Sequence, residues 1–107
     1  MSWLTSLIPP SITVLQPNGG ESIFRGSPYE ITWTSIGNIE NVKIEFSKNN
    51  GGTWQTIIES TENTGIYGYT IPIPGEQKDN CLIRISDVDG YPTDVSDAVF
   101  TVTVPGS

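Results

Sequence analysis

The chain has 107 residues, of which 36% are apolar, so it can form one packed domain with little room for a second. Its 12 acidic and 5 basic residues give a net charge of −7. This balance argues against a nucleic-acid partner or an anionic membrane surface, because both bind through clustered lysines and arginines. The sequence has no histidine, which removes Ser-His and Cys-His catalysis and the commonest metal ligand.

Residues 1–10 (MSWLTSLIPP) form an apolar arm ahead of a domain expected at 11–105. The arm lacks the basic start of a signal peptide and is too short to span a membrane, so no membrane insertion is predicted. One interpretation is a linker that packs loosely on its own domain. The other is a segment that docks on another copy of the chain through four apolar side chains. These are Trp3, Leu4, Leu7 and Ile8.

In the first half of the chain, β-branched and alternating residues predict strands at 11–16, 29–34 and 41–46, with a short edge piece at 22–25. The segment 17–21 (PNGGE) is a turn, because asparagine and glycine tolerate positive φ. In the strand at 29–34, apolar and polar residues alternate, and Trp33 is the best candidate for a central core aromatic.

The segment 47–54 (SKNNGGTW) gives the strongest hairpin signal, because two asparagines and two glycines separate two apolar-alternating runs. It resembles the Asp-box pattern S-x-D-x-G-x-T-W, with Asn49 in place of the usual aspartate. The expected role of Asn49 is to cap backbone amides inside the turn. A single copy of this pattern indicates a structural hairpin and no glycosidase.

The second half predicts strands at 54–59, 66–73, 81–86 and 98–104, with a turn at 63–65 and polar loops at 75–80 and 87–97. Pro72 and Pro74 are expected to end a strand and protect its edge. The single cysteine, Cys81, alternates with Ile83 and Ile85 and is expected to be buried. About seven short strands without a helical period predict an all-β, two-sheet antiparallel β-sandwich.

Two loop features are candidate ligand sites. Carboxylates at alternate positions before Gly90 suggest a calcium loop, which would use Asp87, Asp89, Asp94 and Asp97. Turn-forming aspartates explain the run more simply, since Gly90 occupies a ligand position and Ala98 stands where a glutamate is needed. Tyr91 precedes a proline in this loop and is the aromatic residue best placed to stack on a sugar. No catalytic site and no cofactor are predicted.

Six segments carry a resemblance to a known family, in the order PNGGE (17–21), ITWTS (31–35), VKIEFSKNNGGTW (42–54), GIYGYTIP (65–72), IRISD (83–87) and SDAVFTV (96–102). Over about residues 12–103 the chain resembles bacterial and archaeal surface modules of the Ser-Thr-rich, GPI-anchored-protein type, related to the KNH-like domain of fungal cell-wall proteins. The resemblance implies an immunoglobulin- or fibronectin-III-like sandwich on an extracellular or cell-surface protein. It transfers no catalytic residue, since the shared positions are core and turn residues.

The sequence therefore predicts a non-catalytic structural or adhesive module whose partners are neighbouring domains or copies of itself. A first alternative is the subunit of a surface filament assembled through residues 1–10. A second is a carbohydrate-binding module that contacts cell-surface polysaccharide through Tyr91.

Overall fold

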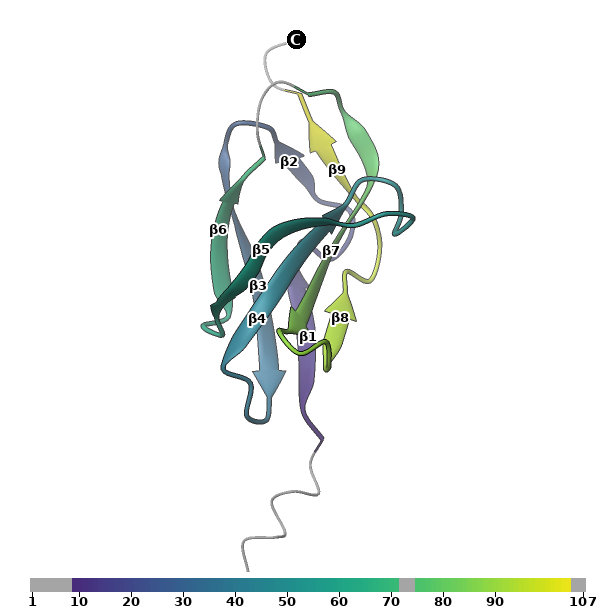
Figure 1. Cartoon of the computed structure of the whole chain (residues 1–107). Coiled ribbons are helices and arrows are strands. Elements are labelled where there is room, and N and C mark those ends of the chain that lie inside the picture. Colours follow the sequence, from purple (N-terminus) through teal and green to yellow (C-terminus); the bar gives the residue numbers. More distant parts are fainter. Residues whose placement is uncertain (1–8, 72–74, 105–107) are drawn as a thin grey trace, which may run out of the picture.

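The computed structural model describes residues 9–71 and 75–104, and within these ranges the chain forms nine strands and no helix (Figure 1). The strands are β1 (Ser11–Gln16), β2 (Ser22–Phe24), β3 (Pro28–Ile36), β4 (Asn41–Ser47), β5 (Gln55–Glu62), β6 (Ile66–Thr70), β7 (Lys78–Asp87), β8 (Thr93–Val95) and β9 (Phe100–Thr103). A helix long and apolar enough to cross a membrane is therefore not found in the described part.

The strands form two sheets that pack face to face. One sheet has the order β1-β3-β6, and the other has the order β2-β9-β7-β4-β5, with β8 added to β7. In the immunoglobulin type of sandwich, a sheet that contains strands A, B and E packs against a sheet that contains strands C, F and G. Here β1, β3 and β6 correspond to the first group, and β4, β7 and β9 correspond to the second. The predicted all-β, two-sheet fold is thus confirmed.

The structure corrects the number, the bounds and one direction of the predicted strands, since β3 and β5 run past their predicted ends at 34 and 59, and β6 ends at Thr70 instead of 73. There are nine strands instead of about seven, because β2 is regular and the expected loop at 87–97 contains β8. β7 begins at Lys78, within the expected polar loop, because it extends to pair with β9. The sandwich is not wholly antiparallel, since β2 runs parallel to β9. Pro72 and Pro74 lie outside the described residues.

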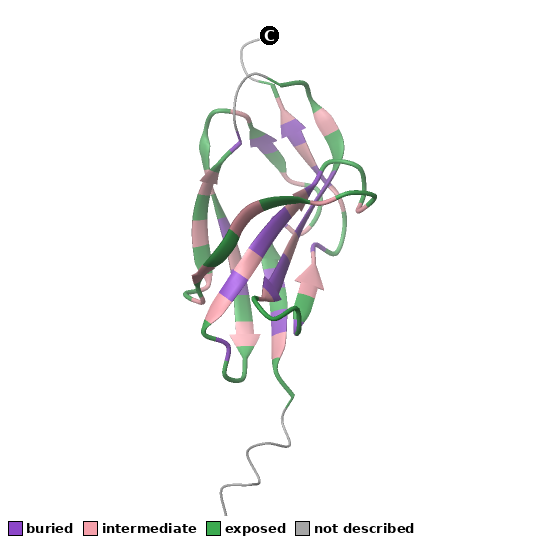
Figure 2. Cartoon of the chain, viewed as in Figure 1, coloured by how far each residue is buried: buried purple, intermediate pink, exposed green. Residues whose placement is uncertain are grey.

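The core lies between the sheets and is made by the inward residues of each strand. Figure 2 shows the resulting alternation of buried and exposed positions along the strands. Trp33 is 2% exposed and belongs to this core, as predicted, and Cys81 is fully buried. The remaining buried members are Ile12, Val14, Ile23, Ile31, Ile39, Val42, Ile44, Ile71, Ile83, Ile85, Phe100 and Val102.

The described chain begins and finishes at opposite ends of the sandwich (Figure 1). We call the end formed by Ser11 and the loops 36–40, 62–66 and 87–92 the amino end. The carboxyl end is formed by Thr103 and the loops 25–27, 48–54 and 75–78. Strand register supports the division, since Ser11 pairs with Ile36, whereas the Arg25 amide donates to the Thr103 carbonyl.

The first described residues are held against the amino end. Gly37 has a φ of 98°, a conformation that favours glycine. A Cβ atom at this position would lie 3.0 Å from Pro10. Glycine at this position therefore lets the chain pass close to the 36–40 loop before β1 begins.

Candidate functional site

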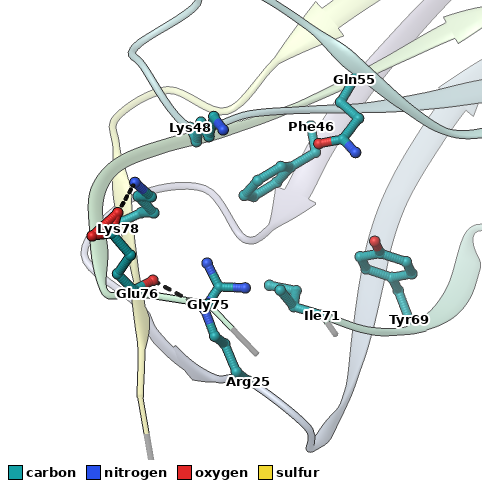
Figure 3. Close-up of a pocket in the computed structure, with 9 residues that line it drawn as sticks. All are labelled: Arg25, Phe46, Lys48, Gln55, Tyr69, Ile71, Gly75, Glu76 and Lys78. Carbon is teal, nitrogen blue, oxygen red and sulfur yellow. Dashed lines mark hydrogen bonds and ion pairs between the residues drawn. The ribbon is translucent and has the colours of Figure 1, made fainter. Parts of the chain in front are cut away.

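The carboxyl end contains a pocket of about 370 Å³ that is lined by cationic, polar and apolar side chains. Figure 3 shows the Arg25 guanidinium pointing into this pocket beneath the ring of Phe46, with Tyr69 and Ile71 on one side. Its lining residues are Arg25, Phe46, Lys48, Gln55, Tyr69, Ile71, Gly75, Glu76 and Lys78. We call this cavity the basic pocket.

The basic pocket gathers three of the five cationic residues of an acidic chain. Lys78 forms an ion pair with Glu76 at 3.0 Å, and the Arg25 Nε donates to the Glu76 carbonyl at 3.0 Å. The hydrogen bond from Lys78, together with the charges of Lys78, Lys48 and Arg25, lowers the pKa of Glu76. Three cations around one carboxylate leave the pocket positive, and counting Asp79 in the adjacent strand does not reverse this sign.

The amino end has the opposite charge. Its three loops contain four carboxylates and no lysine or arginine, and the carboxylates belong to Glu40, Glu62, Asp87 and Asp89. Strand pairing holds them together, because Asn41, which follows Glu40, pairs with Glu62, and Val42 pairs with Asp87. The same end exposes Tyr91, at 67%, and Val88, at 49%.

A second cavity, of about 350 Å³, lies on the outer face of β4 and β7 near the amino end. It contains the ion pair of Glu45 with Arg84, in which the Arg84 Nε and Nη2 donate to the two carboxylate oxygens at 2.8 and 3.0 Å. The Arg84 guanidinium also lies 4.3 Å from the centre of the Trp54 ring. This arrangement covers Glu45, an outward-facing residue that is only 8% exposed. The stacked pair is a rigid polar surface.

The hydrogen bond from Arg84 lowers the pKa of Glu45, while burial of the carboxyl acts in the opposite direction. Because the folded-state pKa is depressed, the unfolded chain binds this proton more tightly, and the contribution to stability is complete above the unfolded pKa of about 4.3. That contribution is lost as the pH falls through the folded-state value.

Glu45→Gln should therefore lower the free energy of unfolding by about 1–3 kcal/mol at neutral pH and flatten its decline in acid. Urea unfolding at a series of pH values measures both effects. Glu59→Gln is the matched control, since Glu45 and Glu59 each lie 3.8 Å from the Lys43 ammonium, but Glu59 is exposed. An unchanged acid profile for Glu45→Gln would contradict the assigned role.

The loop of the 47–54 hairpin is closed by side chains. The Asn49 Oδ1 accepts from the Thr53 amide at 2.9 Å, and the Ser47 Oγ accepts from the Gly51 amide at 2.8 Å. Asn50 and Gly51 adopt positive φ values of 57° and 85°. The Asn49 Nδ2 additionally donates to the Thr53 Oγ1 at 2.9 Å, whereas an ionised aspartate could only accept from that hydroxyl. These bonds close the turn between β4 and β5.

The structure does not bring the four aspartates of the suggested calcium loop together. The Asp94 carboxylate accepts from the Val14 amide in β1, and the Asp97 carboxylate accepts from the Asn18 side chain. Asp87 and Asp89 each accept from a backbone amide two residues on, within their own turn. Among residues 9–71 and 75–104, no group of three or more acidic or cysteine side chains is arranged to hold a metal ion. Calcium binding stays a prediction, which melting in Ca²⁺ against Mg²⁺ would test.

The four apolar residues suggested for self-association, Trp3, Leu4, Leu7 and Ile8, lie outside the described residues. Their docking on another copy stays a prediction. Tyr91 is exposed at the tip of the β7–β8 loop, beside the second cavity, so its position is compatible with a ligand contact.

Sequence reasoning missed the division of charge between the two ends and the polar cluster around Arg84. Glu45 and Arg84 are 39 residues apart and become neighbours only through the register of β4 and β7. Alternation along β4 places Glu45 on the outward side, but it carries no signal that a partner would cover this side chain.

No protein-family model matches the chain, and no curated protein matches it. Among solved structures, the chain is similar to fibronectin(III)-like modules of Clostridium thermocellum CbhA. The two share 22% sequence identity and a TM-score of 0.47, with 87% of this chain and 93% of that chain covered. The fold of this chain is defined by its own strand order.

Proposed function

We propose that the chain is a non-catalytic structural module of a cell-surface or secreted protein, where it spaces or joins neighbouring domains. The observation that carries this proposal is the position of the start of β1 and the end of β9 at opposite ends of the sandwich (Figure 1). If neighbouring domains are joined to the two opposite ends of the module, the module separates them by its full length. The extracellular location in this proposal is supported by the resemblance to Ser-Thr-rich, KNH-like surface modules.

Two copies of the chain joined in tandem should test the spacing role. We expect an extended particle, because the described chain begins and finishes at opposite ends of the sandwich. Small-angle scattering of the tandem against the single chain measures the maximum dimension. A nearly doubled dimension supports the proposal, whereas a compact pair with the copies side by side would overturn it.

Two alternatives use other parts of the molecule. A filament assembled through residues 1–10 would lose its assemblies when that arm is deleted. A carbohydrate-binding role is favoured by the exposed ring of Tyr91 next to a cavity lined by hydroxyl and charged groups, including Ser86 and Thr93. A glycan array with the native chain and the Tyr91→Ala variant tests this role.

A further inference from the structure

We infer that the two ends of the sandwich are complementary surfaces, and that the basic pocket of one copy docks on the acidic amino end of a second copy. The inference rests on the proposed structural role, because it names the partner with which the module would be placed in series. The partner is another copy of this chain, joined head to tail.

Charge complementarity is the first argument. The loops of the amino end hold four carboxylates and no cation, whereas those of the carboxyl end hold three cations and one carboxylate. Opposite charges that face one another across a contact favour association and fix its orientation. Two amino ends, or two carboxyl ends, would bring like charges together, so head-to-tail contact is the favoured pairing.

Apolar side chains are the second argument. Of the seven large apolar residues that are clearly exposed in the described part, six lie at or next to the two ends. Ile36, Ile66, Val88 and Tyr91 lie at the amino end, Phe24 and Val104 lie at the carboxyl end, and Leu15 lies elsewhere. Apolar residues rimmed by charge are typical of a surface that is buried by a partner.

Shape is the third argument. Tyr91 projects from a loop tip that also carries Asp87 and Asp89, and it is 67% exposed. The basic pocket is a cavity of about 370 Å³ whose lining includes the rings of Phe46 and Tyr69. In a head-to-tail contact, an aromatic ring flanked by carboxylates would thus meet a cavity that contains the Arg25 guanidinium beside the rings of Phe46 and Tyr69. Contacts between unlike surfaces of identical copies do not close, so they generate a linear chain.

The net charge of −7 opposes this association at long range. At about 0.1 M salt, the Debye length of about 10 Å screens the repulsion between whole molecules and leaves charges in contact less affected. The head-to-tail contact should therefore be observed near physiological ionic strength. It should weaken at about 1 M salt, where the Debye length is about 3 Å.

Sedimentation velocity of the full chain over a wide concentration range tests the inference. Glu40→Lys with Glu62→Lys reverses charge at the amino end, and Lys48→Glu with Lys78→Glu does so at the carboxyl end. We expect the native chain to associate, and each double variant to lose roughly tenfold or more in association constant. The amino-end variant is decisive, because it reduces the net charge, so general repulsion alone would predict stronger association. Glu30→Lys, on the exposed face of β3, is the control and should not weaken association.

Mixing the two double variants provides the second arm. Each retains one intact end, and the two intact ends are complementary, so the mixture should associate more strongly than either variant alone. Only a folded variant can supply its intact end, so this stronger association also shows that both variants fold. A native chain that stays monomeric, or a variant that associates as the native chain does, would overturn the inference. If the single chain stays monomeric but the tandem is extended, the head-to-tail inference fails and the spacing role is still supported. If the tandem is compact, the spacing role fails, whatever the association of the single chain.

Discussion

Phe100→Ala is expected to lower the free energy of unfolding by about 3–5 kcal/mol. Phe100 is 2% exposed, and its ring packs against that of Phe46 with 6.3 Å between the ring centres. The truncation removes buried apolar area and leaves a cavity between the two sheets, which a close-packed core fills only in part. A loss of this size is a large share of the 5–15 kcal/mol that stabilises a typical domain.

Urea unfolding measures this loss as a lower midpoint. Phe24→Ala is the matched control, because Phe24 is the same residue type in a neighbouring strand but is 49% exposed. The control should change stability by much less than Phe100→Ala. Equal effects of the two substitutions would show that Phe100 does not occupy the centre of the core.

Asn63→Ala is expected to cost about 2–4 kcal/mol, although Asn63 lies in a turn. Its Oδ1 accepts from the indole Nε1 of Trp33 at 2.7 Å, and its Nδ2 donates to the Ile39 carbonyl at 2.9 Å and to the Ser35 Oγ at 2.8 Å. Removing the amide leaves the indole N–H of a nearly buried tryptophan without its acceptor. An unsatisfied buried donor incurs the desolvation penalty of the group.

A double-mutant cycle with Trp33→Phe isolates this interaction. Phenylalanine has no N–H, so Asn63→Ala should cost less in the Trp33→Phe chain than in the native one, by about 0.5–3 kcal/mol. Asn38→Ala, at an exposed position in a nearby loop, is the control and should be close to neutral. Additive effects in the cycle would mean that Asn63 and Trp33 are not coupled.

The strands could be predicted because local patterns determine them. Val42 and Ile44 alternate with polar residues, and the glycines and asparagines of 47–54 allow only a tight reversal. The core position of Trp33 followed from the same alternation. These features depend on residues within a few positions of one another, so a single sequence is enough to recover them.

The remaining features depend on residues brought together by register. β8 has three residues, too few for a period, and it forms because Thr93 and Val95 pair with β7. Asp94 appeared to be a turn or calcium residue because its acceptor role toward Val14, 80 positions away, has no local signature. The two charged ends likewise combine loops from separate hairpins, and their opposite signs emerge only when those loops are assigned to the same end.

The positions of β1 and β9 determine how the module would respond to tension. β1 begins at the amino end and is paired along its length with β3, while β9 finishes at the carboxyl end and is paired with β2 and β7. A pull between the two ends runs along these strands and across their hydrogen bonds, which lie roughly perpendicular to antiparallel strands. The hydrogen bonds of each terminal strand would then be loaded together in shear instead of opening one after another. A module loaded in this way resists mechanical unfolding more than its free energy of unfolding alone implies.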